Sequence, residues 1–122
     1  MFYPVRSIHS YVHHQRIGVL AEFGLETDFA QRTDEFARLA QDILLHIAAM
    51  APADVTELLA QPFVKQTQLT IGEMLDEVAE QLRERLAMLR FVRWDIESPR
   101  REDADPQPPG PPAAAARLRV VR

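Results

Sequence analysis

The sequence contains no cysteine. This absence excludes a disulfide framework and a metal site built on thiolates, and it fits a protein that folds in a reducing compartment. The sequence also lacks any apolar run near the roughly 20 residues that a membrane-spanning helix needs. Its first six residues, MFYPVR, resemble neither a secretory signal nor a transit peptide. We therefore expect a cytoplasmic protein with no membrane contact.

Glycine is scarce, with four residues spread along 122 positions and no cluster among them. A phosphate-binding loop needs clustered glycines whose backbone approaches the phosphates, so we expect no nucleotide cofactor. Nucleophile-elbow and zinc-protease motifs are absent as well, which argues against an enzyme. Basic residues are outnumbered over residues 1–97, with 9 Lys and Arg against 15 Asp and Glu. This acidic balance predicts no nucleic-acid partner.

A change of composition divides the chain near Ser98. Residues 98–122 hold six of the nine prolines, an alanine run and five arginines. A segment of this composition buries too little apolar surface to offset the entropy lost on ordering it. We therefore predict one folded domain over residues 1–97 and a disordered Pro/Ala/Arg-rich tail over residues 98–122.

Hydrophobic periodicity predicts an α+β fold in the order β-β-α-α-β. Thr33 is the expected N-cap of one helix, and the sequence TIGE at 70–73 is a capping-box signature that begins another. The predicted elements are strands at 8–12 and 16–23 joined by a turn at 13–15, a helix at 33–50, a stretch at 54–68 that is mostly loop with an extended segment at 61–64, a helix at 70–86 and a strand at 87–96. These elements predict a small three-stranded antiparallel sheet with two helices.

The last predicted strand is apolar on both faces. Strict alternation divides its apolar residues into Met88, Val92, Trp94 and Ile96 on one face and Leu89 and Phe91 on the other. Two helices can cover one face of a sheet, so the other face is expected to need a partner subunit. Gly18, in the second strand, indicates a close approach by another backbone or side chain. We therefore expect a homodimer.

An acid and a large aromatic residue, Asp28 and Phe29, stand side by side after the second strand. They suit an exposed docking wedge, because burial of Phe29 would bring Asp28 into the core without a partner. In the alternative, Phe29 tucks under the loop and Asp28 caps the next turn. The residues by themselves favour the tucked arrangement.

The histidines and the carboxylates do not predict a metal site. His9 and His13 are expected to share a strand face, but no carboxylate or thiolate completes a ligand set. His46 falls beside the apolar stripe of the first helix and is expected to be packed and hydrogen-bonded. The acidic residues of the second helix, Glu84 among them, are expected to form a solvated face.

Five short sequences occur in an order that resembles the dimerisation core of translation elongation factor Ts. They are YVHHQRIGVL at 11–20, ETDF at 26–29, HIAAMAP at 46–52, QPFVK at 61–65 and RFVRW at 90–94. The resemblance covers most of residues 7–97. Members of this family are guanine-nucleotide exchange factors of the GTPase elongation factor Tu, and the resemblance implies that function here. It also implies a homodimer, because long members carry two copies of this subdomain and this chain has one.

The resemblance further implies which residues meet the GTPase. Asp28 and Phe29 match a pair that enters the GTPase near its magnesium site. His13 matches a hairpin histidine that contacts the GTPase near its phosphate loop, and the family's I-G-E-N word falls on residues 82–85 (LRER). The implied binding set is Thr27, Asp28, Phe29, Ala30, His13, Phe63, Val64, Leu82 and Arg83.

The chain departs from the family pattern in several places. It is expected to lack the amino-terminal helical domain, because it starts directly at the core. The helical hairpin usually inserted between HIAAMAP and QPFVK is missing too, and Arg83 and Arg85 replace two residues of the I-G-E-N word. The alternative function is therefore a dimeric binding or structural module that keeps the fold without exchanging nucleotide.

Overall fold

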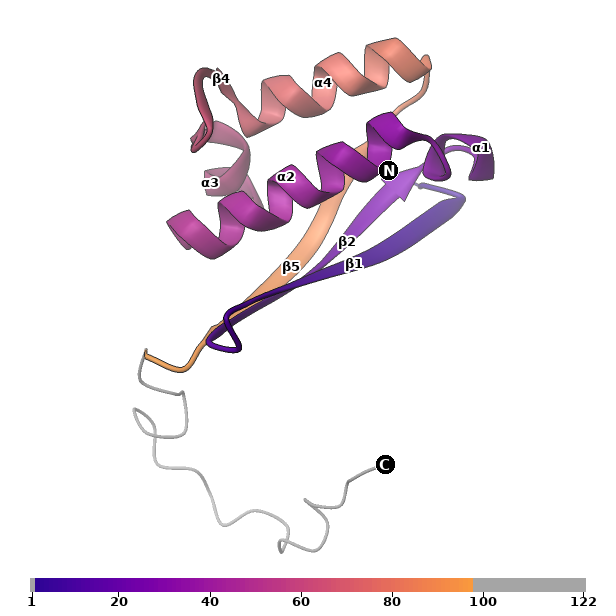
Figure 1. The fold of residues 1–122 in the computed structure, drawn as a ribbon. Helices are drawn as coiled ribbons and strands as arrows, with labels where there is room; N and C mark the ends of the chain where they lie inside the picture. Colours follow the sequence, from indigo (N-terminus) through magenta and orange to yellow (C-terminus); the bar gives the residue numbers. More distant parts are fainter. Residues whose placement is uncertain (1, 98–122) are drawn as a thin grey trace, which may run out of the picture.

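The computed structural model describes residues 2–97, and the predicted tail lies outside the described residues. One layer is a three-stranded antiparallel sheet in the order β1 (Val5–His13), β2 (Ile17–Leu25), β5 (Ala87–Asp95). Two longer helices, α2 (Asp34–Met50) and α4 (Ile71–Leu82), lie on the same side of this sheet (Figure 1). The predicted α+β fold with a small three-stranded antiparallel sheet is confirmed.

Shorter elements fill the connections. Helix α1 (Asp28–Gln31) follows β2, helix α3 (Val55–Ala60) follows α2, and strands β3 (Pro62–Phe63) and β4 (Gln66–Thr70) form a second small sheet. The prediction of mostly loop over residues 54–68 is wrong at α3, whereas the segment expected to be extended, 61–64, contains β3. Asp54 caps α3 by accepting the N–H of Glu57 at 2.8 Å, and Leu58 is fully buried. An N-cap acid three residues before a Glu is a local signal that would have located this helix.

The β1–β2 hairpin turns at the predicted residues. His14 and Gln15 have left-handed φ values of 52° and 61°, and the N–H of Arg16 donates to the carbonyl of His13 at 2.9 Å. Two left-handed residues in a two-residue loop form a type I′ turn, whose twist matches that of the strands. Pairing with β2 extends back to Val5, three residues before the predicted start of the strand.

A β-bulge decides which residues of β5 face the helices. The pairing shifts between Glu22 and Phe23, which leaves Leu89 as the extra residue on β5. Met88 is consequently buried, whereas Trp94 is 76% exposed on the other face. The prediction that Met88 shares a face with Val92, Trp94 and Ile96 is therefore wrong, because strict alternation ends at the bulge.

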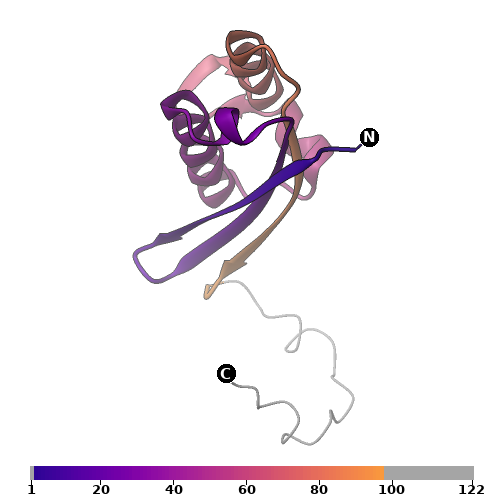
Figure 2. The same ribbon diagram turned by 90° about the vertical axis from the view of Figure 1, so that its right-hand side faces the viewer.

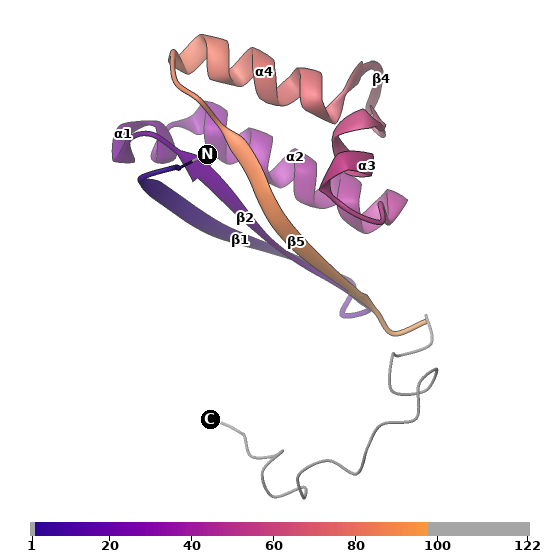
Figure 3. The same ribbon diagram turned by 180° about the vertical axis from the view of Figure 1, so that it is seen from behind.

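That other face of the sheet carries no helix of the described residues (Figure 3). The strands also continue past the end of the helical layer, so one end of the sheet projects from the molecule (Figure 2). We call the face of the sheet that no helix of residues 2–97 covers the open face. Its exposed apolar residues are Ile8, Val12, Leu20, Val92 and Trp94.

Helix α4 begins at the predicted capping box. The Thr70 hydroxyl accepts the N–H of Glu73 at 3.1 Å, and the Glu73 carboxylate accepts the N–H of Thr70 at 2.9 Å. The helix ends four residues earlier than predicted, because Arg83 follows Leu82 in a left-handed conformation with φ 59° and ψ 41°. Leu86 therefore belongs to the connection that leads into β5.

Replacing Arg83 with glycine is expected to stabilise the domain by about 0.5–1 kcal/mol. A left-handed residue other than glycine costs about 1–2 kcal/mol, and the greater freedom of glycine in the unfolded chain removes part of the gain. Within residues 2–97 the exposed Arg83 side chain makes no hydrogen bond or ion pair that would be lost. Urea unfolding of Arg83→Gly and of Arg83→Lys, which keeps the strain, tests this. A Gly variant no more stable than the Lys variant would contradict it.

The core between sheet and helices includes two fully buried rings, Phe23 and Phe36, in an edge-to-face arrangement at 5.5 Å. His9 on β1 packs edge-on against both, with centroid distances of 5.5 and 5.4 Å. Its Nε2 lies 2.6 Å from the hydroxyl of Ser7. Burial lowers the pKa of His9 below its usual value of 6.5.

The free energy of unfolding is expected to decrease as the pH falls below about 6.5. In the unfolded chain His9 takes up a proton at its ordinary pKa, whereas the half-buried ring in the folded protein resists protonation, so the unfolded state binds more protons. Thermal melts between about pH 5 and 7 should therefore show a shallower pH dependence for His9→Gln than for the parent. Gln15→Asn, which changes no titratable group at the exposed turn, is the control that should keep the parental slope. An unchanged slope in His9→Gln would contradict the assignment.

Candidate functional site

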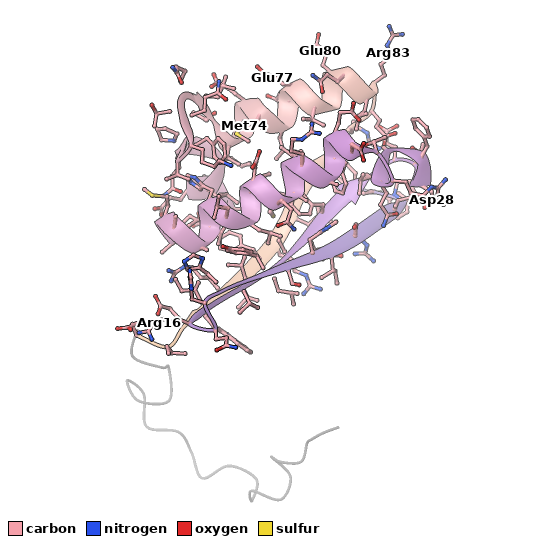
Figure 4. The ribbon with its side chains drawn as sticks, viewed as in Figure 1. Arg16, Asp28, Met74, Glu77, Glu80 and Arg83 are labelled. Carbon is pink, nitrogen blue, oxygen red and sulfur yellow. The ribbon has the colours of Figure 1, made fainter. Side chains whose placement is uncertain are left out.

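A short helix carries the Asp28–Phe29 pair. The hydroxyl of Thr27 caps α1 by accepting the N–H of Ala30 at 3.1 Å, and the hydroxyl of Thr33 donates to the Ala30 carbonyl at 2.8 Å. Ala30 is fully buried, whereas Asp28 is exposed and Phe29 is 71% exposed. Figure 4 places Asp28 at the outer edge of the molecule. The tucked arrangement of Phe29 is therefore wrong, and Thr27 rather than Asp28 caps the turn.

Glu84 binds the backbone of the same segment from across the fold. Its Oε1 accepts the N–H of Glu26 at 2.9 Å and that of Thr27 at 3.1 Å, and its Oε2 accepts the Thr27 hydroxyl at 2.7 Å. The expectation that Glu84 belongs to a solvated helix face is wrong, because α4 ends at Leu82. An ionised acceptor makes these hydrogen bonds stronger than neutral ones.

Glu26 makes the reciprocal connection. Its Oε2 accepts the backbone N–H of Arg85 at 2.7 Å and the guanidinium Nε at 2.9 Å. These bonds, the backbone one foremost, lower the pKa of the Glu26 carboxyl. The guanidinium of Arg85 also lies 4.9 Å from the centroid of the Tyr3 ring. Residues 26–30 and 82–85 thus meet in one place, which we call the α1 corner.

Six of the nine predicted binding residues lie at the α1 corner, namely Thr27 to Ala30 with Leu82 and Arg83. Leu82 is half-buried against the core, and Arg83 is exposed. Figure 4 shows Arg83 and Asp28 at the same end of the helical layer. The corner therefore presents an acid, an aromatic ring and a cation on one part of the surface.

His13 lies at the opposite end of the sheet. It pairs with Ile17 at the start of β2, whereas the α1 corner follows Leu25 at its end. Eight residues of strand separate the two ends, which is about 27 Å at about 3.4 Å per residue. The Nδ1 of His13 is 2.7 Å from the Tyr11 hydroxyl. One copy of the chain therefore does not bring His13 and Phe29 together.

The remaining two predicted residues lie on the β3–β4 hairpin. Phe63 is 4% exposed and packs against His46, with ring centroids 6.1 Å apart, whereas Val64 is 40% exposed. Phe63 therefore attaches the hairpin to the core, and Val64 is the residue that a partner can touch.

His46 is fully buried and hydrogen-bonded, as predicted. Its Nδ1 accepts the N–H of Val64 at 3.1 Å, and its Nε2 is 2.8 Å from the side-chain oxygen of Gln61. A backbone N–H can only donate, so Nδ1 is the unprotonated nitrogen and Nε2 carries the hydrogen.

Sequence reasoning missed the supporting roles of Glu26 and Glu84. The two loops that they join are 58 residues apart in the chain. An acid placed just after the end of a helix was the available signal, but the helix was predicted to run past it. The register of such a long-range pair follows from the fold and not from local sequence.

Other kinds of site receive no support from residues 2–97. In that range no group of three or more His, Cys, Asp or Glu residues is arranged to hold a metal ion. No helix of that range is long and apolar enough to cross a membrane. An open cleft of about 180 Å³ lies between α2 and α4, with Met74 and Glu77, labelled in Figure 4, on its wall.

No family model matches the chain. The sequence is similar to elongation factor Ts of Rubrobacter xylanophilus, with 33% identity over 135 aligned positions that cover 73% of this chain and 69% of that relative. Elongation factor Ts of Solibacter usitatus is 30% identical over 148 positions, covering 84% of this chain and 70% of the relative. Elongation factor Ts of Trichlorobacter lovleyi is 32% identical over 80 positions, which are 66% of this chain and 26% of the relative.

The first two alignments are longer than the chain itself. They extend over 135 and 148 positions, whereas the chain has 122 residues. Both relatives therefore carry residues within the aligned region that have no counterpart here.

Proposed function

We propose that this chain, which belongs to the elongation factor Ts family, binds the GTPase elongation factor Tu in the cytoplasm and promotes release of its GDP. The observation that carries the proposal is the exposed Phe29, 71% accessible on the first turn of α1 beside Asp28. Exposed aromatic residues on well-held elements are typical anchors of protein interfaces. Hydrogen bonds hold the chain on both sides of this pair: Glu84 binds the backbone of residues 26–27, and Thr33 binds the carbonyl of Ala30.

The proposed mechanism is allosteric. Burial of Phe29 in the GTPase would supply about 1.5–3 kcal/mol, and Asp28 would act near the magnesium site, as the family pattern implies. Magnesium requires near-ideal octahedral geometry, so small displacements of its ligands weaken nucleotide binding. By linkage, the factor and GDP weaken each other's binding to the same extent. The chain then acts as a binding partner and forms no covalent intermediate.

Release of labelled GDP from elongation factor Tu, measured with and without the protein, tests this function. We expect faster release that increases with the concentration of the protein and saturates. Unchanged release together with undetectable binding would contradict the proposal.

The second candidate is a dimeric module that binds without exchanging nucleotide. Two observations favour it: the aligned relatives carry residues with no counterpart here, and the exposed cation Arg83 stands at the α1 corner. Measurements of GDP release and of binding to elongation factor Tu separate the two candidates. Measurable binding with unchanged GDP release would select the non-exchanging module.

We also propose that the open face binds a second copy of the chain. Val12, Gly18 and Trp94 are aligned across the three strands in one row, and Leu20 and Val92 belong to the next. Their exposed side chains form an apolar surface that water contacts unfavourably. The row that follows holds Ile8 on β1 but is charged on β2 and β5, where Glu22 pairs with Arg90 at 2.7 Å. Glu22 also pairs with Arg6, from the row beyond, at 3.6 Å.

Gly18 gives this surface a notch. Within residues 2–97, and apart from Gly18 and its two chain neighbours, no heavy atom lies within 4 Å of the position that a Cβ at Gly18 would occupy, although Trp94 is aligned with it on the next strand. The close approach expected from the sequence is therefore not made within the described part of the chain. In a twofold dimer each copy offers Trp94 to the notch of the other, so the surface is self-complementary.

Replacing Trp94 with aspartate is expected to convert the dimer to a monomer. An acid buried in an apolar interface without a partner is strongly unfavourable. Light scattering at micromolar concentration should give twice the chain mass for the parent and the single chain mass for Trp94→Asp. Gly18→Val, which fills the notch, should weaken self-association, and Phe29→Asp should not change it. A monomeric parent with a cooperative melt would contradict the proposal.

A further inference from the structure

Helix α1 is too short to hold its own conformation. It has four residues, Asp28–Gln31, and nucleation of an isolated helix turn is unfavourable in water. Phe29 and Asp28 are both exposed, so neither side chain anchors the turn to the core. Ala30, fully buried, is a small anchor. The orientation of the Asp28–Phe29 pair therefore depends on groups outside the helix.

Glu84 fixes the first turn of α1 through a relay. Its carboxylate can only accept, so the single hydroxyl hydrogen of Thr27 points to Glu84 across 2.7 Å. The oxygen of that hydroxyl is then left to accept the N–H of Ala30 at 3.1 Å. The backbone N–H of Thr27 donates to the same carboxylate at 3.1 Å. One carboxylate thus sets both the side chain and the backbone of the N-cap.

The frame that carries Glu84 is itself fixed. The backbone N–H of Glu84 donates to the Ala79 carbonyl at 3.1 Å, which ties it to the end of α4. The next residue, Arg85, donates its N–H to Glu26 at 2.7 Å, so each loop supplies a carboxylate to the backbone of the other. Two carboxylates used in this way hold the loops in one register.

We propose that Glu84 is a positioning residue, which orients α1 so that Phe29 and Asp28 meet the GTPase in a single arrangement. This inference rests on the proposed function. Glu84 acts through Thr27 and makes no contact with the partner itself. It contributes to binding by fixing the position of Phe29. A preorganised contact residue loses less entropy on binding than one on a mobile loop.

A double-mutant cycle with elongation factor Tu–GDP tests the inference. Glu84→Ala is expected to weaken binding about tenfold when Phe29 is present, because small misplacements of a contact residue lower affinity. In the Phe29→Ala background the same change should weaken binding less than about threefold. Glu80→Ala is the matched control, since this exposed acid lies four residues earlier, on α4, and points away from the corner in Figure 4. It should leave the affinity unchanged in both backgrounds.

A second readout does not require the partner. Hydrogen exchange of the Ala30 amide, followed by NMR, should be faster in Glu84→Ala than in the parent and in Glu80→Ala. Glu84→Gln keeps an oxygen for the two backbone N–H groups, so it should restore part of both the affinity and the protection. Thermal melts identify any variant that is unfolded, in which case Glu84→Gln alone is compared.

The outcomes separate the two proposals. Parental affinity in Glu84→Ala, or an equal loss of affinity with and without Phe29, would overturn the positioning role while leaving the proposed function in place. If the parent itself does not bind elongation factor Tu, the proposed function fails and the role of Glu84 toward a GTPase fails with it. The exchange rate of the Ala30 amide then decides whether Glu84 orders α1.

Discussion

Replacing Phe29 with alanine is expected to leave the fold intact and to weaken binding of elongation factor Tu by about 2 kcal/mol, which is about thirtyfold in affinity. The ring is 71% exposed, so truncating it removes few contacts within the chain. Surface changes of this kind usually alter the free energy of unfolding by less than about 0.5 kcal/mol. Calorimetric titration and urea unfolding of the same preparation give the two quantities.

Phe36→Ala is the matched control for this prediction. Phe36 is fully buried against Phe23 and His9, so its truncation should cost about 3–5 kcal/mol of stability. Asp28→Ala extends the test, because an acid that perturbs the magnesium site should lower the rate of GDP release more than it lowers affinity. A large loss of stability in Phe29→Ala, or unchanged affinity, would contradict the assignment of Phe29 as the anchor.

Replacing His46 with leucine is expected to destabilise the domain by about 2–3 kcal/mol. The ring is fully buried and joins α2 to the residues that flank the two ends of β3, Gln61 at 2.8 Å and Val64 at 3.1 Å. Leucine fills a similar volume but leaves a donor and an acceptor without partners, each at a cost of about 1–3 kcal/mol where water does not reach them. The free energy of unfolding in urea measures the loss.

His46→Asn separates lost hydrogen bonds from lost packing. Its side-chain oxygen can take the place of Nδ1 and accept the N–H of Val64, so the loss should be smaller than in His46→Leu. Equal losses in both variants would show that the shape of the ring, and not its hydrogen bonds, attaches the β3–β4 hairpin.

The elements found from the sequence were those with local determinants. The Thr33 cap, the Thr70–Glu73 capping box and the hairpin turn at His13 to Arg16 all act within four residues, and the structure has each of them. Helix α3 was missed although its cap is equally local, because six residues give little periodicity. The bulge at Leu89 escaped prediction because it exists only in the pairing of β2 with β5.

The candidate site shows the same division. The residues alone favoured a tucked Phe29, and only the order of the family's short sequences favoured the exposed arrangement that the structure has. No local pattern could reveal that Glu84 caps the segment before α1, since the contact joins residues 57 apart. The implied binding set also came as one group, whereas the fold distributes it over the α1 corner, the turn end of the β1–β2 hairpin and the β3–β4 hairpin.

The strand order has a consequence for the behaviour of the protein at high concentration. Within the described residues β1 pairs with β2 alone, so the other edge of a nine-residue strand keeps its backbone donors and acceptors open to solvent. Packing of two open faces forms a dimer and leaves no open face for a third copy. Edge-to-edge strand pairing, in contrast, can add further copies and leads to larger aggregates. The excess of acidic residues over residues 1–97 opposes this pairing by repulsion between molecules. Added salt screens that repulsion, so concentrated solutions should aggregate first at high ionic strength.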